Sequence, residues 1–95
     1  MTKEYILDFL RTNKELLHEK YNVTKIGLFG SYAKGLETSD SDIDIAIVSH
    51  KKDFFIREDL REFLEASFHL KVDLGYVDSF REYYKKRIEG DIIYV

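Results

Sequence analysis

The stretch Gly27–Val48, GLFGSYAKGLETSDSDIDIAIV, decides how this sequence is interpreted. An apolar run stops at Gly30-Ser31, and aspartates then occupy the alternate positions Asp40, Asp42 and Asp44 before the chain becomes apolar again. Residues two apart in a strand point to the same face, so Asp42 and Asp44 should project side by side. Because neighbouring carboxylates repel each other, a hard divalent cation is their natural partner. Asp40 lies further out in a polar loop and is expected to be a solvated turn residue.

A third carboxylate follows later in the chain. Asp73 sits between Val72 and Leu74 in another apolar run, where a bound ion is a good reason to tolerate a charge. Three aspartates on two adjacent strands can hold one or two Mg²⁺ ions, with waters and substrate phosphates completing the coordination. These positions predict a magnesium site.

Gly30 and Ser31 suit the phosphates that such an ion would bring. A glycine at the end of a strand lets a phosphate approach the backbone, and the free N–H groups of the next helix can donate to it together with the serine hydroxyl. A metal site beside a phosphate-binding site predicts phosphoryl or nucleotidyl transfer.

Each of these features has a simpler interpretation when it is taken alone. Gly30 and Ser31 are also a common strand end and helix cap, Asp42 and Asp44 could be solvated turn acids, and Asp73 could be a surface residue of its strand. The combination of all five at this spacing favours the metal site.

Two better-known motifs do not fit. Gly30-x4-Gly35 begins like a P-loop, but Leu36 and Glu37 follow where Lys and Ser or Thr are required. The alternating aspartates begin like an EF-hand, but Ile45 replaces the turn glycine and Lys51 stands in the position of the bidentate glutamate.

Composition narrows the class of protein. The chain has 95 residues, a formal net charge of -3 and no cysteine, which predicts one domain over residues 1–95 without disulfides. An acidic balance disfavours nucleic-acid binding, and the absence of a long apolar run predicts a soluble cytoplasmic protein without a membrane role. The basic cluster Lys85, Lys86 and Arg87 is assigned to a solvated helix end.

Hydrophobic periodicity predicts the element order ααβαβαβαβ. Strands are expected over residues 23–29, 43–48, 72–77 and 92–95, with the second central and the last at an edge that could pair with another copy. A short helix from Ser31 to Gly35 and an amphipathic helix ending near Leu70 separate the first three strands. Capping boxes at Thr12/Glu15 and Ser79/Glu82 are expected to start the second and the last helix. The predicted class is α+β with a small mixed sheet.

The spacing Gly30-Ser31-x10-Asp42-x-Asp44 resembles the signature of the polymerase-beta superfamily of nucleotidyltransferases, and Asp73 stands where that superfamily carries its third aspartate. The small size, the leading helices and the Glu89-Gly90 ending closely resemble the minimal nucleotidyltransferase (MNT) family over nearly the whole chain. The resemblance implies a polymerase-beta-like fold, with helices packed on a small mixed sheet.

The resemblance also implies roles for individual residues. Gly30 and Ser31 would hold the triphosphate, Asp42 and Asp44 would bind two Mg²⁺ ions, and Asp73 would bind the catalytic ion and help deprotonate the attacking hydroxyl. MNT proteins are paired with HEPN-domain toxins, which implies an antitoxin that transfers AMP from ATP to a tyrosine of its partner. Lys34 replaces the arginine frequent in the family and would make only a point-charge contact, so it is not assigned to the site.

Two other functions stay open at this point. The protein could neutralise its toxin by binding alone, with the metal site kept for nucleotide sensing or structure. It could instead transfer a nucleotide to a small hydroxylated molecule such as an aminoglycoside, which would require an added domain or a dimer cleft. The acceptor, the nucleotide preference, and the choice between a homodimer and a hetero-oligomer with the toxin are not encoded in any motif here.

Overall fold

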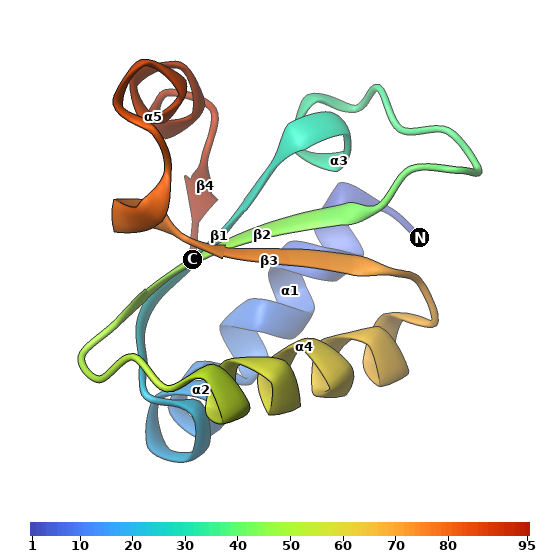
Figure 1. The fold of residues 1–95 in the computed structure, drawn as a ribbon. Coiled ribbons are helices and arrows are strands. Elements are labelled where there is room, and N and C mark those ends of the chain that lie inside the picture. Colours follow the sequence, from blue (N-terminus) through green and yellow to red (C-terminus); the bar gives the residue numbers. More distant parts are fainter.

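The computed structural model describes residues 1–95 as five α-helices, four strands and one 3₁₀ turn. In chain order these are α1 (Lys3–Thr12), α2 (Lys14–Tyr21), β1 (Val23–Phe29), α3 (Gly30–Lys34), β2 (Ile43–Ser49), α4 (Phe54–Phe68), β3 (Val72–Tyr76), the turn η1 (Val77–Ser79), α5 (Glu82–Glu89) and β4 (Ile93–Tyr94). The predicted order of helices and strands is confirmed, with the 3₁₀ turn as an addition (Figure 1).

The strands form one mixed sheet in the order β3-β2-β1-β4. β1 pairs antiparallel with both β2 and β4, whereas β2 and β3 run parallel. β2 is therefore a central strand and β4 an edge strand, as the sequence predicts. The α+β class with a small mixed sheet is confirmed.

The two faces of the sheet differ. α1, α2 and α4 cover one face, and α3 and α5 lie on the other (Figure 1). Side chains alternate along β2, so Ile43, Ile45 and Ile47 point into the three-helix side and are almost completely buried there. Leu60 and Leu64 of α4 are fully buried against them. This side holds the hydrophobic core, and it leaves the alternate residues of each strand on the face of α3 and α5.

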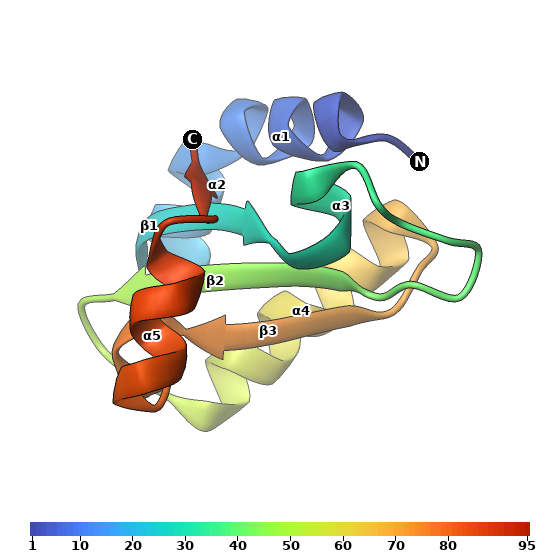
Figure 2. The same ribbon diagram turned by 90° about the horizontal axis from the view of Figure 1, so that it is seen from above.

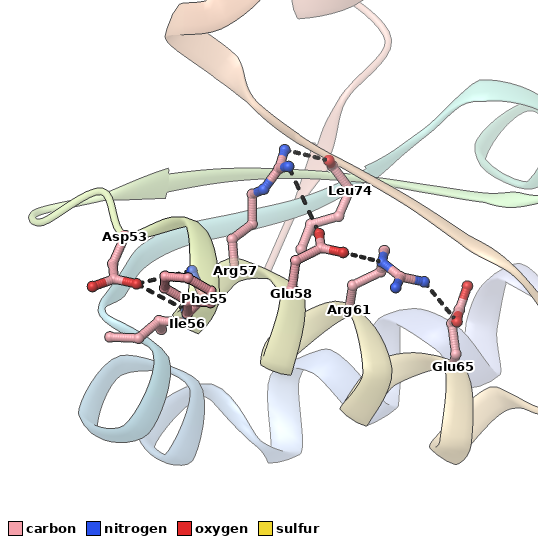
Figure 3. A network of polar contacts seen from close by, with 8 residues as sticks. All are labelled: Asp53, Phe55, Ile56, Arg57, Glu58, Arg61, Glu65 and Leu74. Atoms are coloured by element: carbon pink, nitrogen blue, oxygen red, sulfur yellow. Dashed lines mark hydrogen bonds and ion pairs between the residues drawn. The ribbon is translucent and has the colours of Figure 1, made fainter.

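A polar network along α4 supports β3 from the core side (Figure 3). Arg57, Glu58, Arg61 and Glu65 form successive ion pairs, and Arg57 also reaches the carbonyl of Leu74. Glu65 Oε2 accepts a hydrogen bond of 2.9 Å from the backbone N–H of Val72, the first residue of β3. The last helical turn of α4 thus holds the beginning of the strand that carries Asp73.

Both predicted capping boxes are wrong. Thr12 is the last residue of α1, and the residue between the two helices is Asn13, whose side chain donates to the carbonyl of Phe9 instead of capping α2. Ser79 belongs to the 3₁₀ turn, and the extended residues Phe80 and Arg81 separate it from α5. In each case the preceding element continues into the residue that the motif would have used as a cap.

The other boundaries differ little from expectation. α4 ends at Phe68 because His69 adopts the left-handed conformation with φ 57°, two residues before the expected end. Its N-terminus is capped by Asp53, whose carboxylate accepts from the N–H groups of Phe55 and Ile56 (Figure 3). No helix combines the length and the apolar character needed to cross a membrane.

Candidate functional site

A cavity of about 360 Å³ opens on the less covered face of the sheet. α3 and α5 lie above this face at its opposite ends (Figure 2). Asp44 of β2 and Asp73 of β3 line the cavity together with Gly30, which begins α3. The structure therefore brings three of the five predicted site residues into one cavity.

Asp44 and Asp73 are direct partners in the parallel pairing of β2 and β3. Neighbouring strands lie about 4.8 Å apart, so the two carboxylates project beside each other from the sheet. Asp44 is half-buried and Asp73 is exposed. Burial raises the pKa of Asp44 to about 6, and the negative charges of Asp73 and Asp42 add to the effect.

Gly30 is required by the position of Asp44. Its backbone has φ 74°, a conformation that glycine adopts at no steric cost. A Cβ at this position would overlap the Asp44 carboxylate oxygen and would lie 2.9 Å from its Cγ. The Asp44 carboxylate therefore occupies the space that a side chain at residue 30 would need. The backbone at the start of α3 lies close to this carboxylate.

Ser31 and Asp42 lie beside the cavity, outside the set of residues that line it. Ser31 is half-buried in α3, where its carbonyl accepts from the N–H of Leu36. Asp42 is exposed and directly precedes β2, close enough for its charge to contribute to the raised pKa of Asp44.

The carboxylates fit a hard divalent cation, although no three His, Cys, Asp or Glu side chains converge into a complete set of ligands. Mg²⁺ is commonly bound through one or two carboxylates, with water and substrate phosphates as the other ligands. Asp44 and Asp73 supply oxygen donors of that kind on adjacent strands, and a positive ion would also relieve the repulsion that raises the pKa of Asp44.

Several lining residues come from parts of the chain to which the sequence analysis gave no site role. Phe80, Tyr84 and Arg87 contribute from the segment after β3, and Lys34 and Asp91 form an ion pair of 3.3 Å between Nζ and Oδ2. Arg87 belongs to the basic cluster that the sequence analysis assigned to a solvated helix end. No motif in the sequence predicts that α5 packs over the sheet. The sequence therefore contains no indication that these residues belong to the site.

Comparisons with known proteins identify the family and the fold. A mixed sheet with paired aspartates beside a Gly-Ser at the end of a strand is the arrangement that the sequence resemblance implies for a nucleotidyltransferase. The family model described as the nucleotidyltransferase domain matches residues 10–95, and the chain belongs to this family. The class of enzyme expected from the sequence is thereby confirmed.

Relatives of similar length carry more specific names. A Methanocaldococcus jannaschii protein provisionally named protein adenylyltransferase MJ1379 is 44% identical over 98 residues, covering 99% of this chain and 98% of the relative. The protein adenylyltransferase MntA of Thermococcus cleftensis is 34% identical over 96 residues, covering 100% of this chain and 97% of the relative. The resemblance to the MNT family is confirmed.

Solved structures show the same fold. A minimal nucleotidyltransferase structure superposes with a TM-score of 0.83 over 98% of this chain and 95% of that chain, at 19% identity. A toxin-antitoxin structure with AMP-PNP is 30% identical, with a TM-score of 0.61 over 85% of this chain. This chain covers 61% of the length of that second protein. The polymerase-beta-like fold expected from the sequence is confirmed.

Proposed function

We propose that this protein is an antitoxin that transfers AMP from ATP to a tyrosine of a HEPN-domain toxin. The observation that carries the proposal is the in-register pair Asp44 and Asp73 on the floor of the cavity, next to the backbone of Gly30. The names of the relatives, protein adenylyltransferase and MntA, support the reaction, and the toxin-antitoxin structure with AMP-PNP supports both the nucleotide and the kind of partner.

The proposed roles follow the position of each residue. The backbone at Gly30 and the hydroxyl of Ser31 hold the triphosphate at the start of α3. Asp42 and Asp44 would hold two Mg²⁺ ions, and Asp73 would hold one of them. When bound, the ions offset the charge on the attacking and leaving oxygens.

Asp73 faces the acceptor because it is the more exposed of the two paired carboxylates. The tyrosine oxygen attacks the α-phosphorus of ATP, so a new oxygen–phosphorus bond forms while the bond to the β-phosphate breaks and pyrophosphate leaves. Asp73 accepts the proton of the tyrosine hydroxyl. The exposure of Asp73 leaves room for a side chain that a separate protein inserts from solvent.

The test is intact-mass spectrometry on the HEPN-type protein encoded beside this one, after incubation with this protein, ATP and Mg²⁺. A mass gain of one or more AMP units is expected, and the double variant Asp42→Asn/Asp44→Asn should abolish it. Asp40→Asn is the matched control because Asp40 is exposed in the loop and does not line the cavity. Fragmentation of the modified protein should place the AMP on a tyrosine.

An unchanged mass, with the two proteins still bound to each other, would refute AMP transfer to that partner. Neutralisation that survives in the double variant would then identify a protein that acts by masking the toxin.

A further inference from the structure

α5 forms the wall of the cavity opposite α3, and it carries a positive charge into the site. Tyr84, Arg87 and Ile88 line the cavity from this helix. Ile88 is 7% exposed, so it anchors the last turn of α5 against the rest of the protein. Its neighbour Arg87 is exposed and lines the cavity, whereas the adjacent Lys85 and Lys86 do not.

Arg87 differs from the other cation of the cavity. Lys34 is paired with Asp91 at 3.3 Å. Arg87 takes part in none of the ion pairs of the structure, although the same cavity contains Asp44, Asp73 and Asp91. The guanidinium is always charged and presents a planar fork of donors that matches two oxygens of a phosphate. The cavity therefore contains, together with its carboxylates, an arginine without an ion-pair partner that is suited to bind phosphate.

The transfer reaction fixes where the phosphates of ATP must lie. The α-phosphate has to reach the acidic pair because bond formation takes place there, and the β- and γ-phosphates continue from it within the same cavity. A cavity of about 360 Å³ falls within the range of small-molecule sites, roughly 300 to 1,000 Å³. The terminal phosphates carry several negative charges, so a protein cation in this cavity would stabilise them in addition to the bound Mg²⁺.

We propose that Arg87 binds the terminal phosphates of the nucleoside triphosphate, so that α5 supplies a polyphosphate subsite facing the one at Gly30 and Ser31. The inference rests on the proposed function, in which ATP is the donor. Arg87 is a substrate-binding residue in this scheme, and it holds the part of ATP that leaves as pyrophosphate. The basic end of α5 then has a role in the reaction.

The test is calorimetric binding of ATP and of AMP, each with Mg²⁺, to the purified protein without an acceptor. Arg87→Gln removes the charge and keeps an aliphatic stem of good helix propensity. Loss of charge-assisted hydrogen bonds should weaken ATP binding about 10- to 100-fold, with AMP binding changed less than about twofold. Arg87→Lys should lie between wild type and Arg87→Gln because it keeps the charge and loses the fork.

Lys86→Gln is the matched control, since it makes the same change at an exposed neighbour that does not line the cavity. It should bind both nucleotides as wild type does. Equal ATP affinity of Arg87→Gln and wild type would overturn the subsite and leave the proposed function standing. Equal weakening of ATP and AMP would overturn it too, because a terminal-phosphate contact cannot affect AMP. A wild-type protein that binds no ATP would overturn the proposed function and the subsite together.

Discussion

Replacing Asp44 by asparagine is expected to stabilise the protein when a chelator removes divalent cations. The pKa of Asp44 is raised from 3.8 to about 6 by burial and by the charges of Asp73 and Asp42. A shift of about 2 units corresponds to roughly 3 kcal/mol of unfavourable free energy for the ionised carboxylate in the folded state. Because the side chain is partly exposed, solvent screening reduces this to about 1 to 2 kcal/mol.

The pH dependence has a definite sign. A carboxyl whose pKa is higher in the folded state binds its proton more tightly there, so its ionisation costs folding stability. The cost is absent below about pH 3.8, grows between pH 3.8 and about 6, and is complete above that range. Asp44→Asn should therefore unfold at a higher temperature than wild type at pH 8, by roughly 5 to 15 °C, and at the same temperature at pH 3.5.

Thermal unfolding followed by circular dichroism across this pH range measures the difference. Asp40→Asn, which makes the same change in the exposed loop, should match wild type at every pH. Added Mg²⁺ should stabilise wild type in proportion to its binding and should stabilise Asp44→Asn less. An Asp44→Asn variant that is no more stable than wild type at pH 8 in chelator would refute the electrostatic account of the acidic pair.

Three further changes test other parts of the site. Gly30→Ala places a methyl group on the Asp44 carboxylate and should abolish transfer. Its loss of stability in urea unfolding should exceed that of Gly35→Ala, where φ is 71° but no atom lies within 4 Å of the added Cβ. Equal losses would show that only the left-handed conformation matters, which costs about 1 to 2 kcal/mol. The pKa of Glu65 is lowered because its carboxylate accepts from the Val72 N–H, so Glu65→Gln should be less stable than wild type at pH 7, and this difference should shrink as the pH falls below 4.5. A difference of the same size at pH 7 and at pH 3 would contradict this assignment. A Cβ at Gly75 would lie 2.9 Å from Cε1 of Phe80, so Gly75→Ala should displace this ring, which lines the cavity. The variant should bind ATP more weakly, while its free energy of unfolding changes by less than about 1 kcal/mol. Unchanged calorimetric binding would show that the ring does not contact the nucleotide.

The strands and the long helix could be predicted because their signals are local and repeated. β2 was recognisable from Ile43, Ile45 and Ile47, and its central place in the sheet followed from a near-continuous apolar run that only Asp44 interrupts. The capping boxes failed because a cap depends on the residues that surround it in space. Thr12 matches the motif in sequence, but it is still part of α1, so its backbone is not free to begin α2.

The acidic pair was also predictable, since each aspartate interrupts an apolar run that a charge would otherwise avoid. Asp44 and Asp73 were expected on adjacent strands, and the parallel register places them directly opposite each other. The lining from α5 was not predictable in this way. Arg87 and Tyr84 have no unusual spacing in the sequence, and they enter the site only because α5 crosses the sheet surface above β2 and β3 (Figure 2).

By itself, the sequence determined the element order, the α+β class, the family signature and the carboxylates that the chemistry needs. The element order and the fold class follow from hydrophobic periodicity, and the carboxylates stand out because a charge in an apolar strand is costly unless it has a partner. Both signals are visible in the sequence alone. Only the tertiary structure decided that Gly30 must lack a side chain to make room for Asp44, and that Arg87 lines the same cavity as the acidic pair. The reason is that these residues lie 14 to 43 positions apart in the chain, and their geometry is set by how α3 and α5 pack on the sheet.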